Sequence, residues 1–264
     1  MIKRLLKITV FVLSTLMLGY CVVKIFMFDT FIVRGCSMEP TYYDGDRVYV
    51  NKLLMGARVY TDLNFSKSKL HSVRVLGLRN VVVGDELVVN YPYASCGDTI
   101  NFKINKVYLK RCYGGPGDTI SIIEGFYRNS NIIGNIGPIQ FQSVLNKVSD
   151  SLLKINGVAL EAYPLNNDIC WTIKNFGPLY VPHKGDIIEL TKNNITLYDK
   201  LIQYETGEFP QICDDKIMIA GKEILEYTFT CNWYFLGGDN VVNSEDSRYI
   251  GLIPEDYIIG IVNK

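Results

Sequence analysis

Residues 83–89 read VGDELVV, and this stretch shows the local pattern that decides the fold class. A Gly-Asp pair makes a tight turn, because Gly accepts a positive φ and Asp bonds nearby backbone N–H groups, and β-forming residues follow it at once. The same pattern returns at residues 45–50, 117–123 and 185–190 in a chain that is rich in Tyr, Val, Ile and Gly. We therefore predict a mainly β fold.

An apolar run near the N-terminus spans residues 5–28 and is interrupted only by Lys7 and Lys24. Its uncharged part, residues 8–23, covers about 24 Å as a helix. Because lysine side chains can reach the membrane surface, the whole run approaches the ~30 Å thickness of a bilayer core. We predict that residues 1–29 form a cytoplasmic tip and a single transmembrane anchor, since no second apolar run is long enough to span.

The basic residues Lys3, Arg4 and Lys7 lie at the start of this run. The positive-inside rule then puts the N-terminus in the cytoplasm and the rest of the chain on the outer, periplasmic side of the cell membrane. A cleaved signal peptide is the alternative. We favour the anchor, because no small-residue cleavage site follows the run and the bulky Tyr20 interrupts the lipoprotein-like segment at residues 18–21.

Charge and cysteine usage exclude several classes of function. The 264 residues carry 27 Lys and Arg against 27 Asp and Glu, so no overall positive charge attracts nucleic acid. No two of the seven cysteines are spaced as C-x-x-C, and the only histidines are His71 and His183. These spacings do not match a zinc site, so we expect neither a metal nor a cofactor, while disulfide pairing stays open.

The first candidate for chemistry is the segment RGCSMEPT, residues 34–41, which follows the anchor. Ser37 lies in a turn with an exposed hydroxyl, and most segments of this kind are turns and nothing more. Cys36 is its neighbour. Adjacent side chains on an extended chain point in opposite directions, so we do not expect Cys36 to be the attacking group.

Lysine is the candidate base, because neither histidine lies in a segment with other catalytic signals. A free lysine has a pKa near 10.4, and bringing it close to neutrality takes about 3 pKa units, or about 4 kcal/mol, mainly through desolvation. Lys110 follows the β-type run at residues 107–109 and precedes a Gly-rich turn. On a strand it shares one face with Tyr108, while Arg111 faces the other way. The alternative is that Lys110 and Arg111 form a solvated strand end.

A third segment, residues 237–249, packs Gly, Asp, Asn, Ser and Arg residues between β-like flanks. It could be a polar loop with internal Asx turns. It could also be a support that orients a nearby base.

Together these segments resemble the bacterial type I signal peptidases, the Ser/Lys serine peptidase family. Residues 37–41 are similar to the family's S-M-x-P-T box, and residues 110–118 to its K-R-x-x-G-x-P-G-D box. Residues 238–248 are similar to its G-D-N-x-x-N-S-x-D-S-R box, and residues 83–89 to an intervening strand box. The four boxes occur in the family's order after an anchor.

The resemblance implies a role for each matching residue. Ser37 would be the nucleophile, Lys110 the general base, and Ser244 the hydroxyl that hydrogen-bonds the lysine amine. The resemblance also implies supporting residues around them: Gly35, Arg111, Asp239, Asp246 and Arg248.

Two departures from the family pattern affect this site. The family often has Arg-Asp where this chain has Val241 and Val242, which leaves the support less charged. Some members carry Ser or Thr where this chain has Gly35, and that hydroxyl serves the oxyanion hole. The backbone N–H of Ser37 would therefore bear more of that task here.

The resemblance also implies the architecture: an antiparallel β catalytic domain over residues 30–120 and 232–264, with a smaller β-rich region inserted at residues 121–231. The implied activity is membrane-bound removal of signal peptides from exported preproteins after small side chains, by a monomer in contact with the bilayer. Three alternatives stay open. They are a catalytically silent anchored β domain that binds export partners, a peptidase with few dedicated substrates, and a self-cleaving Ser/Lys repressor, against which the anchor argues.

Overall fold

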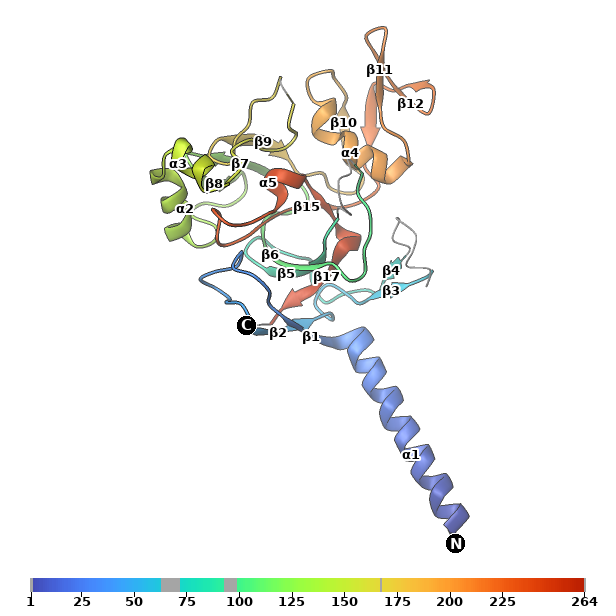
Figure 1. The fold of residues 1–264 in the computed structure, drawn as a ribbon. Coiled ribbons are helices and arrows are strands. Elements are labelled where there is room, and N and C mark those ends of the chain that lie inside the picture. Colours follow the sequence, from blue (N-terminus) through green and yellow to red (C-terminus); the bar gives the residue numbers. More distant parts are fainter. Residues whose placement is uncertain (1, 63–71, 93–98, 167, 264) are drawn as a thin grey trace.

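A computed structural model describes residues 2–62, 72–92, 99–166 and 168–263 (Figure 1). His71 and Cys96 lie outside these ranges. The described chain consists of a long N-terminal helix and a body built mainly of β strands. Further helices lie on parts of the body away from the N-terminal helix (Figure 1). The predicted mainly β fold is confirmed.

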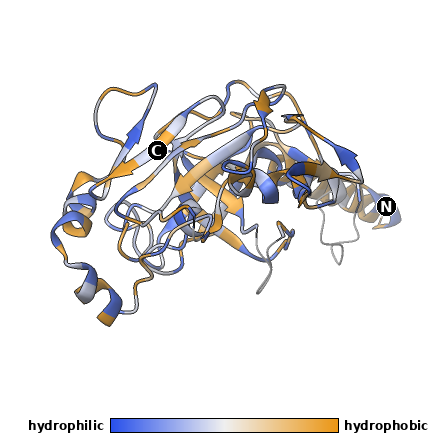
Figure 2. Cartoon of the chain, turned by 90° about the horizontal axis from the view of Figure 1, so that it is seen from above, coloured by the Kyte–Doolittle hydropathy of each residue, from blue (hydrophilic) through white to orange (hydrophobic). Residues whose placement is uncertain are grey.

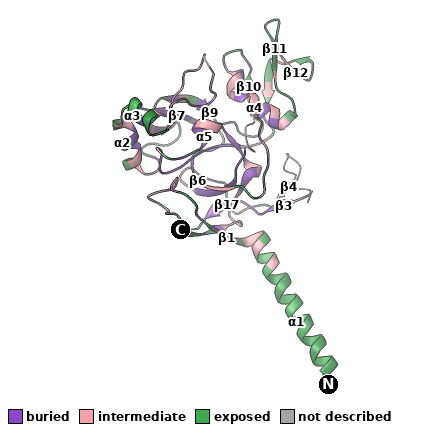
Figure 3. Ribbon diagram, viewed as in Figure 1, coloured by how far each residue is buried: buried purple, intermediate pink, exposed green. Residues whose placement is uncertain are grey.

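The N-terminal helix α1, Ile2–Val22, continues through a π-helical turn, Val23–Met27. These 26 residues form the one helix among the described residues that is long and apolar enough to cross a membrane, and they span about 39 Å. The helix stands away from the body and its residues are mostly exposed (Figure 3), and many of these residues are hydrophobic (Figure 2). A soluble core helix would bury such a surface, so this helix is suited to a bilayer.

The body is organised around a curled seven-stranded sheet in which every paired neighbour is antiparallel. The candidate segments at residues 34–41, 83–89, 110–118 and 237–249 lie on this sheet or in connections that begin or end at its strands. In spatial order the strands are β1 Phe28–Ile32, β2 Arg47–Asn51, β17 Ile258–Val262, β5 Glu86–Asn90, β6 Val107–Gly114, β15 Trp233–Gly237 and β16 Ile253–Pro254.

The Gly-Asp turns do precede strands. Gly45, Gly84, Gly117 and Gly185 have φ angles between 89° and 97°, which side chains with a Cβ rarely adopt. The strands that follow them are β2, β5, β7 Thr119–Ile123 and β10 Ile187–Glu189.

The region at residues 121–231 contains small sheets and also three helices, which the strand pattern did not predict. Its proposed boundaries stay a prediction, because the main hydrophobic core includes Leu87 and Phe235 from the large sheet together with Tyr127 and Tyr204 from this region. The helices are α2 Ile139–Lys147, α3 Asp150–Ile155 and α4 Ile195–Thr206. The remaining strands are β8 Phe126–Asn129, β9 Phe176–Tyr180, β11 Gln211–Cys213, β12 Lys216–Ile219, β13 Lys222–Glu223 and β14 Glu226–Thr228, with the pair β3 Arg58–Tyr60 and β4 Ser72–Arg74 outside it.

The large sheet separates two apolar clusters. Leu87 and Val89 of β5 point into the main core, while Val88 between them joins a small cluster with Val33 and Val48. This alternation is expected along a strand that is covered on both faces. The small cluster lies at the start of the turn that carries Ser37, so it gives that turn a fixed apolar base.

Candidate active site

Ser37 lies in the turn between the hairpin strands β1 and β2. Met38, next to it, is buried and anchors the turn, and the Gly35 N–H donates to Asp44 Oδ1 at 2.8 Å. The Ser37 carbonyl accepts the Asn240 N–H at 3.0 Å, which ties the turn to the loop after β15. The predicted turn is therefore held at both ends, and its serine is half-buried rather than exposed.

Lys110 reaches this serine from β6. Its side chain is 4% exposed, and its Nζ lies 2.8 Å from Ser37 Oγ in a hydrogen bond. Nζ also lies 5.7 Å from the centroid of the Tyr108 ring, in agreement with the prediction that the two share a face. The alternative of a solvated strand end is wrong, because the amine is enclosed.

Burial changes the protonation of this amine. Desolvation lowers the pKa of Lys110 from 10.5 to about 8, against the opposing charge of Asp246. At pH 7 about one amine in ten is then neutral, compared with about one in three thousand for an ordinary lysine. A neutral amine at hydrogen-bond distance can accept the hydroxyl proton, so this pair can generate a nucleophilic serine.

Arg111, the next residue, faces the other way and joins three segments of the chain. It makes two hydrogen bonds of 2.7 Å to the carboxylate of Asp239, which is fully buried, and an ion pair of 2.9 Å to Glu86 on β5. Thr41 Oγ1 donates to the same aspartate. The sequence reasoning identified Arg111 and Asp239 but missed Glu86 and Thr41. Only their positions inside two of the matched boxes could have indicated them.

Asp246 and Arg248 form a second buried pair beneath the loop. The guanidinium donates to both carboxylate oxygens at 2.8 and 2.9 Å, and to the Val241 carbonyl at 2.7 Å. Asp246 also accepts the Gly238 N–H at 3.0 Å and caps the short helix α5, Ser247–Ile250. Burial would raise the pKa of Asp246, but the charge and hydrogen bonds of Arg248 hold it below its ordinary value.

A groove runs alongside the serine. Its volume is about 500 Å³, and its walls are residues 31–35 before Ser37 and residues 105–109 before Lys110. In the part of β6 at residues 107–109 the strand pairs with β5 but not with β15, and β1 pairs only with β2 within the described residues. Both walls therefore present strand edges with unpaired backbone groups toward the groove.

No group of three or more His, Cys, Asp or Glu residues in the described ranges could hold a metal ion. The pair at hydrogen-bond distance beside the groove is a serine hydroxyl and a lysine amine.

Comparison with known proteins shows the family of the chain. The family described as signal peptidase, peptidase S26, matches residues 2–264. The chain belongs to this family. The signal peptidase I of Buchnera aphidicola subsp. Schizaphis graminum is 24% identical over 243 residues, which cover 92% of this chain and 69% of the relative. The signal peptidase I T of Bacillus subtilis is 27% identical over 239 residues, 90% of this chain and 73% of the relative.

The S26 family identifies the chain as a serine peptidase, a hydrolase. Signal peptidase I from Bacillus amyloliquefaciens is also similar, at 25% identity over 240 residues, 90% of this chain and 73% of the relative. A crystal structure of a signal peptidase I from Enterococcus faecalis shares 16% identity at a TM-score of 0.33, covering 70% of this chain and 97% of that chain. A TM-score this low has no bearing on the fold.

One hydrogen bond expected from the signal peptidase pattern is not formed. Ser244 is buried, but its Oγ has no hydrogen-bond partner within the described residues, and the amine of Lys110 bonds Ser37 instead. Ser244 lies close to the turn that carries Ser37 all the same. A Cβ built on Gly238 would meet both Ser244 Oγ, at 2.2 Å, and the Ser37 carbonyl oxygen, at 2.5 Å.

The departure at Val241 and Val242 and the cysteine beside Ser37 both have structural consequences. Val241 is buried in the main core, and Val242 packs against it, so apolar packing occupies the place of the charged pair. Cys36 Sγ accepts a hydrogen bond of 3.0 Å from Asn243 Nδ2 while Ser37 bonds Lys110. The Cys36 thiol is therefore hydrogen-bonded to Asn243 and not to the Lys110 amine, as expected for a residue that is not the attacking group.

Proposed function

We propose that this serine peptidase removes signal peptides from exported preproteins, with Ser37 as the nucleophile and Lys110 as the general base. The observation that carries the proposal is the 2.8 Å contact between Ser37 Oγ and a buried lysine amine. These two side chains come from segments 73 residues apart and meet beside an open groove.

In the proposed reaction the neutral amine of Lys110 takes the proton of Ser37, and Oγ attacks the carbonyl carbon of the peptide bond to be cut. The tetrahedral intermediate collapses as Lys110 returns the proton to the leaving amine of the mature chain. The signal peptide then stays as an ester on Ser37. Lys110 next removes a proton from water, which attacks the ester and releases the signal peptide with a free carboxylate.

The negative oxygen of the intermediate needs a hydrogen-bond donor. The backbone N–H of Ser37 donates to no protein acceptor in the described part of the chain, so it is available for this oxygen. Gly35 supplies no hydroxyl and has a φ of 79°, which suits its place in the turn.

The groove suits an extended segment of the preprotein. Its two walls offer strand edges, so the substrate can add to them by main-chain hydrogen bonds, and its shallow apolar surface would select small side chains before the cut. A tightly turned or helical segment could not make these bonds.

The anchor brings enzyme and substrate together. Its basic start supports a cytoplasmic N-terminus and an active site on the outer, periplasmic side. Enzyme and preprotein then share one membrane, which raises their effective concentration. One chain supplies Ser37, Lys110 and every supporting residue, which supports action as a monomer.

The test is cleavage of a model preprotein by the full-length chain in detergent, with the cut position mapped by mass spectrometry. Ser37→Ala and Lys110→Ala should each lower kcat/KM at least about a thousandfold, because each removes one half of the reacting pair. Lys222→Ala, which changes an exposed lysine, is the matched control and should leave the rate unchanged. Near-full activity of Lys110→Ala would refute the assignment of the base.

A serine-directed acylating probe distinguishes the silent-domain alternative. An active site would carry the probe on Ser37, and a silent binding domain would stay unlabelled. A set of unrelated preproteins distinguishes a general from a dedicated peptidase.

A further inference from the structure

A second cavity, of about 570 Å³, is lined by the loop that contacts the turn carrying Ser37. One wall is the loop at residues 242–245 with Tyr249, and the other is the loop at residues 156–159, which follows α3 in the inserted region. Its size is that of a site for a small ligand or for a few side chains. Neither the catalytic pair nor its supporting ion pairs use this space.

The cavity is continuous with the nucleophile turn through two contacts. Asn243 of its wall donates to Cys36, the residue before the nucleophile, at 3.0 Å. Ser244 of the same wall packs on Gly238 beside the Ser37 carbonyl. A chain that leaves the groove past Ser37 therefore meets this cavity next.

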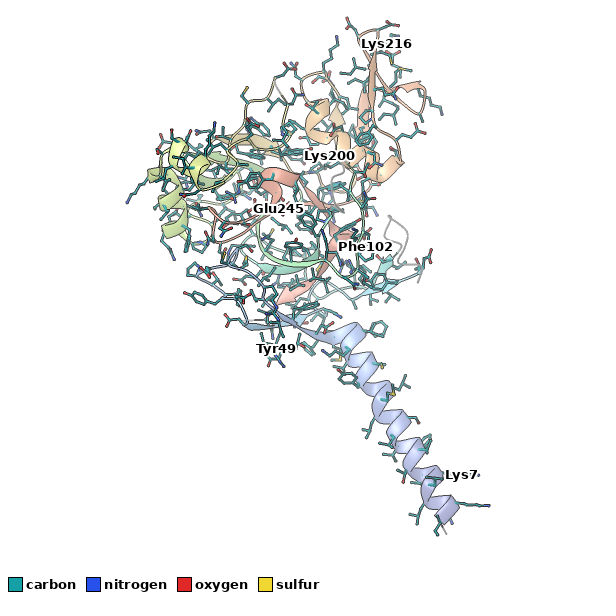
Figure 4. The ribbon with its side chains drawn as sticks, in the orientation of Figure 1. Lys7, Tyr49, Phe102, Lys200, Lys216 and Glu245 are labelled. Atoms are coloured by element: carbon teal, nitrogen blue, oxygen red, sulfur yellow. The ribbon has the colours of Figure 1, made fainter. Side chains whose placement is uncertain are left out.

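The lining combines aliphatic surface with amide and hydroxyl groups and one carboxylate. Val242, Val158 and Ala159 supply aliphatic surface, and the hydroxyl of Tyr249 is occupied by the Ala159 carbonyl at 2.9 Å. Glu245, labelled in Figure 4, is exposed at the rim, where the Tyr91 hydroxyl bonds its carboxylate. Glu245 is the charged residue among those that line the cavity.

We propose that this cavity receives the first two residues of the released mature chain, and that it prefers apolar or basic side chains to acidic ones. The inference rests on the proposed function, which supplies an extended substrate that crosses Ser37. Glu245 would attract a basic side chain and repel an acidic one. Val242 stands where the signal peptidase pattern often has Asp, so this chain has an aliphatic side chain at that point of the wall.

The proposal also assigns a task to the inserted region. Its loop at residues 156–159 forms one wall of the cavity, although the catalytic residues all come from the large sheet and its turns. The inserted region thereby contributes to the choice of substrate on the leaving side of the cut.

The experiment compares two preproteins that are identical up to the cut and carry either Lys or Glu at both of the first two released positions. The full-length wild type should cut the Lys substrate with a kcat/KM about fivefold higher, the size expected of a partly exposed charge pair. Glu245→Gln should bring this ratio close to one, and Glu245→Lys should invert it. Because both substrates use the same Ser37 and Lys110, the ratio cancels any effect of these variants on the catalytic pair.

The control is Glu208→Lys, which makes the same charge change at an exposed glutamate just beyond α4. It should leave the ratio at the wild-type value. An unchanged ratio in Glu245→Gln and Glu245→Lys, with cleavage retained, would overturn the cavity assignment and leave the proposed catalytic pair intact. Cleavage that survives in Ser37→Ala would instead overturn the proposed function.

Discussion

Burial of the Lys110 amine should lower the free energy of unfolding, and this loss can be measured. The side chain is 4% exposed, and its amine makes one hydrogen bond within the described residues, to Ser37. Lys110→Met replaces it with an unbranched apolar side chain that suits the enclosed position. We expect this variant to lose peptidase activity and to be more stable than the wild type at neutral pH.

The magnitude follows from the change in the pKa of Lys110 from 10.5 to about 8. At 1.36 kcal/mol per unit, keeping this lysine buried costs the folded state about 3 kcal/mol at pH 7. Loss of the hydrogen bond to Ser37 offsets about 1 kcal/mol of the gain. The net increase in the free energy of unfolding is then about 2 kcal/mol, or a rise of about 4–8 °C in Tm for a chain of this size.

The pH dependence gives the effect a direction. Between pH 8 and 10.5 the unfolded chain holds a proton on Lys110 that the folded chain has lost, so wild-type stability rises with pH in this window. The advantage of Lys110→Met should therefore be largest below pH 8 and shrink as pH approaches 10. Thermal unfolding of both full-length proteins in the same detergent at pH 7 and pH 9.5 measures this difference.

Lys222→Met, at an exposed lysine of β13, is the matched control and should change Tm by less than about 1 °C at either pH. The reasoning fails if Lys110→Met is less stable than the wild type at pH 7. It also fails if the stability difference is the same at both pH values, because burial of a charge must depend on pH.

Three further outcomes are expected. Below pH 8, kcat/KM should fall about tenfold per pH unit as Lys110 becomes protonated, and a flat profile from pH 6 to 8 would exclude it as the base. Asp239→Asn should lower the free energy of unfolding in denaturant titrations by about 3–5 kcal/mol, because it leaves the Arg111 charge buried without its closest partner. Gly238→Ala should lower activity in cleavage assays while the protein stays folded, because the new Cβ would displace Ser244 and the Ser37 carbonyl.

Much of the fold could be predicted from short patterns. The Gly-Asp turns predicted the starts of β2, β5, β7 and β10, because turn geometry depends on a few adjacent residues. The three helices at residues 139–206 were not predicted, because they lie among short apolar runs without a strong period and are stabilised by packing on the main core.

The sequence predicted which residues form the site better than it predicted the contacts among them. The boxes named Ser37, Lys110, Arg111, Asp239, Asp246 and Arg248, and the structure brings all of these into one connected region. Glu86 and Thr41 were missed, because nothing in their local pattern distinguishes a buried partner from an ordinary strand or turn residue. The expected bond from Ser244 to Lys110 was wrong for this structure, because the amine points to Ser37.

The sequence alone determined the anchor, the positions of the turns and the residue types that a Ser/Lys site needs, because length, hydropathy and turn chemistry are local properties. Only the tertiary structure decided that Lys110 lies 2.8 Å from a serine 73 residues away, and that its amine is buried deeply enough to lower its pKa. It also decided that Val242 and the loop at residues 156–159 face each other across a cavity. Desolvation and contact depend on which distant segments pack together, and short sequence patterns do not contain that information.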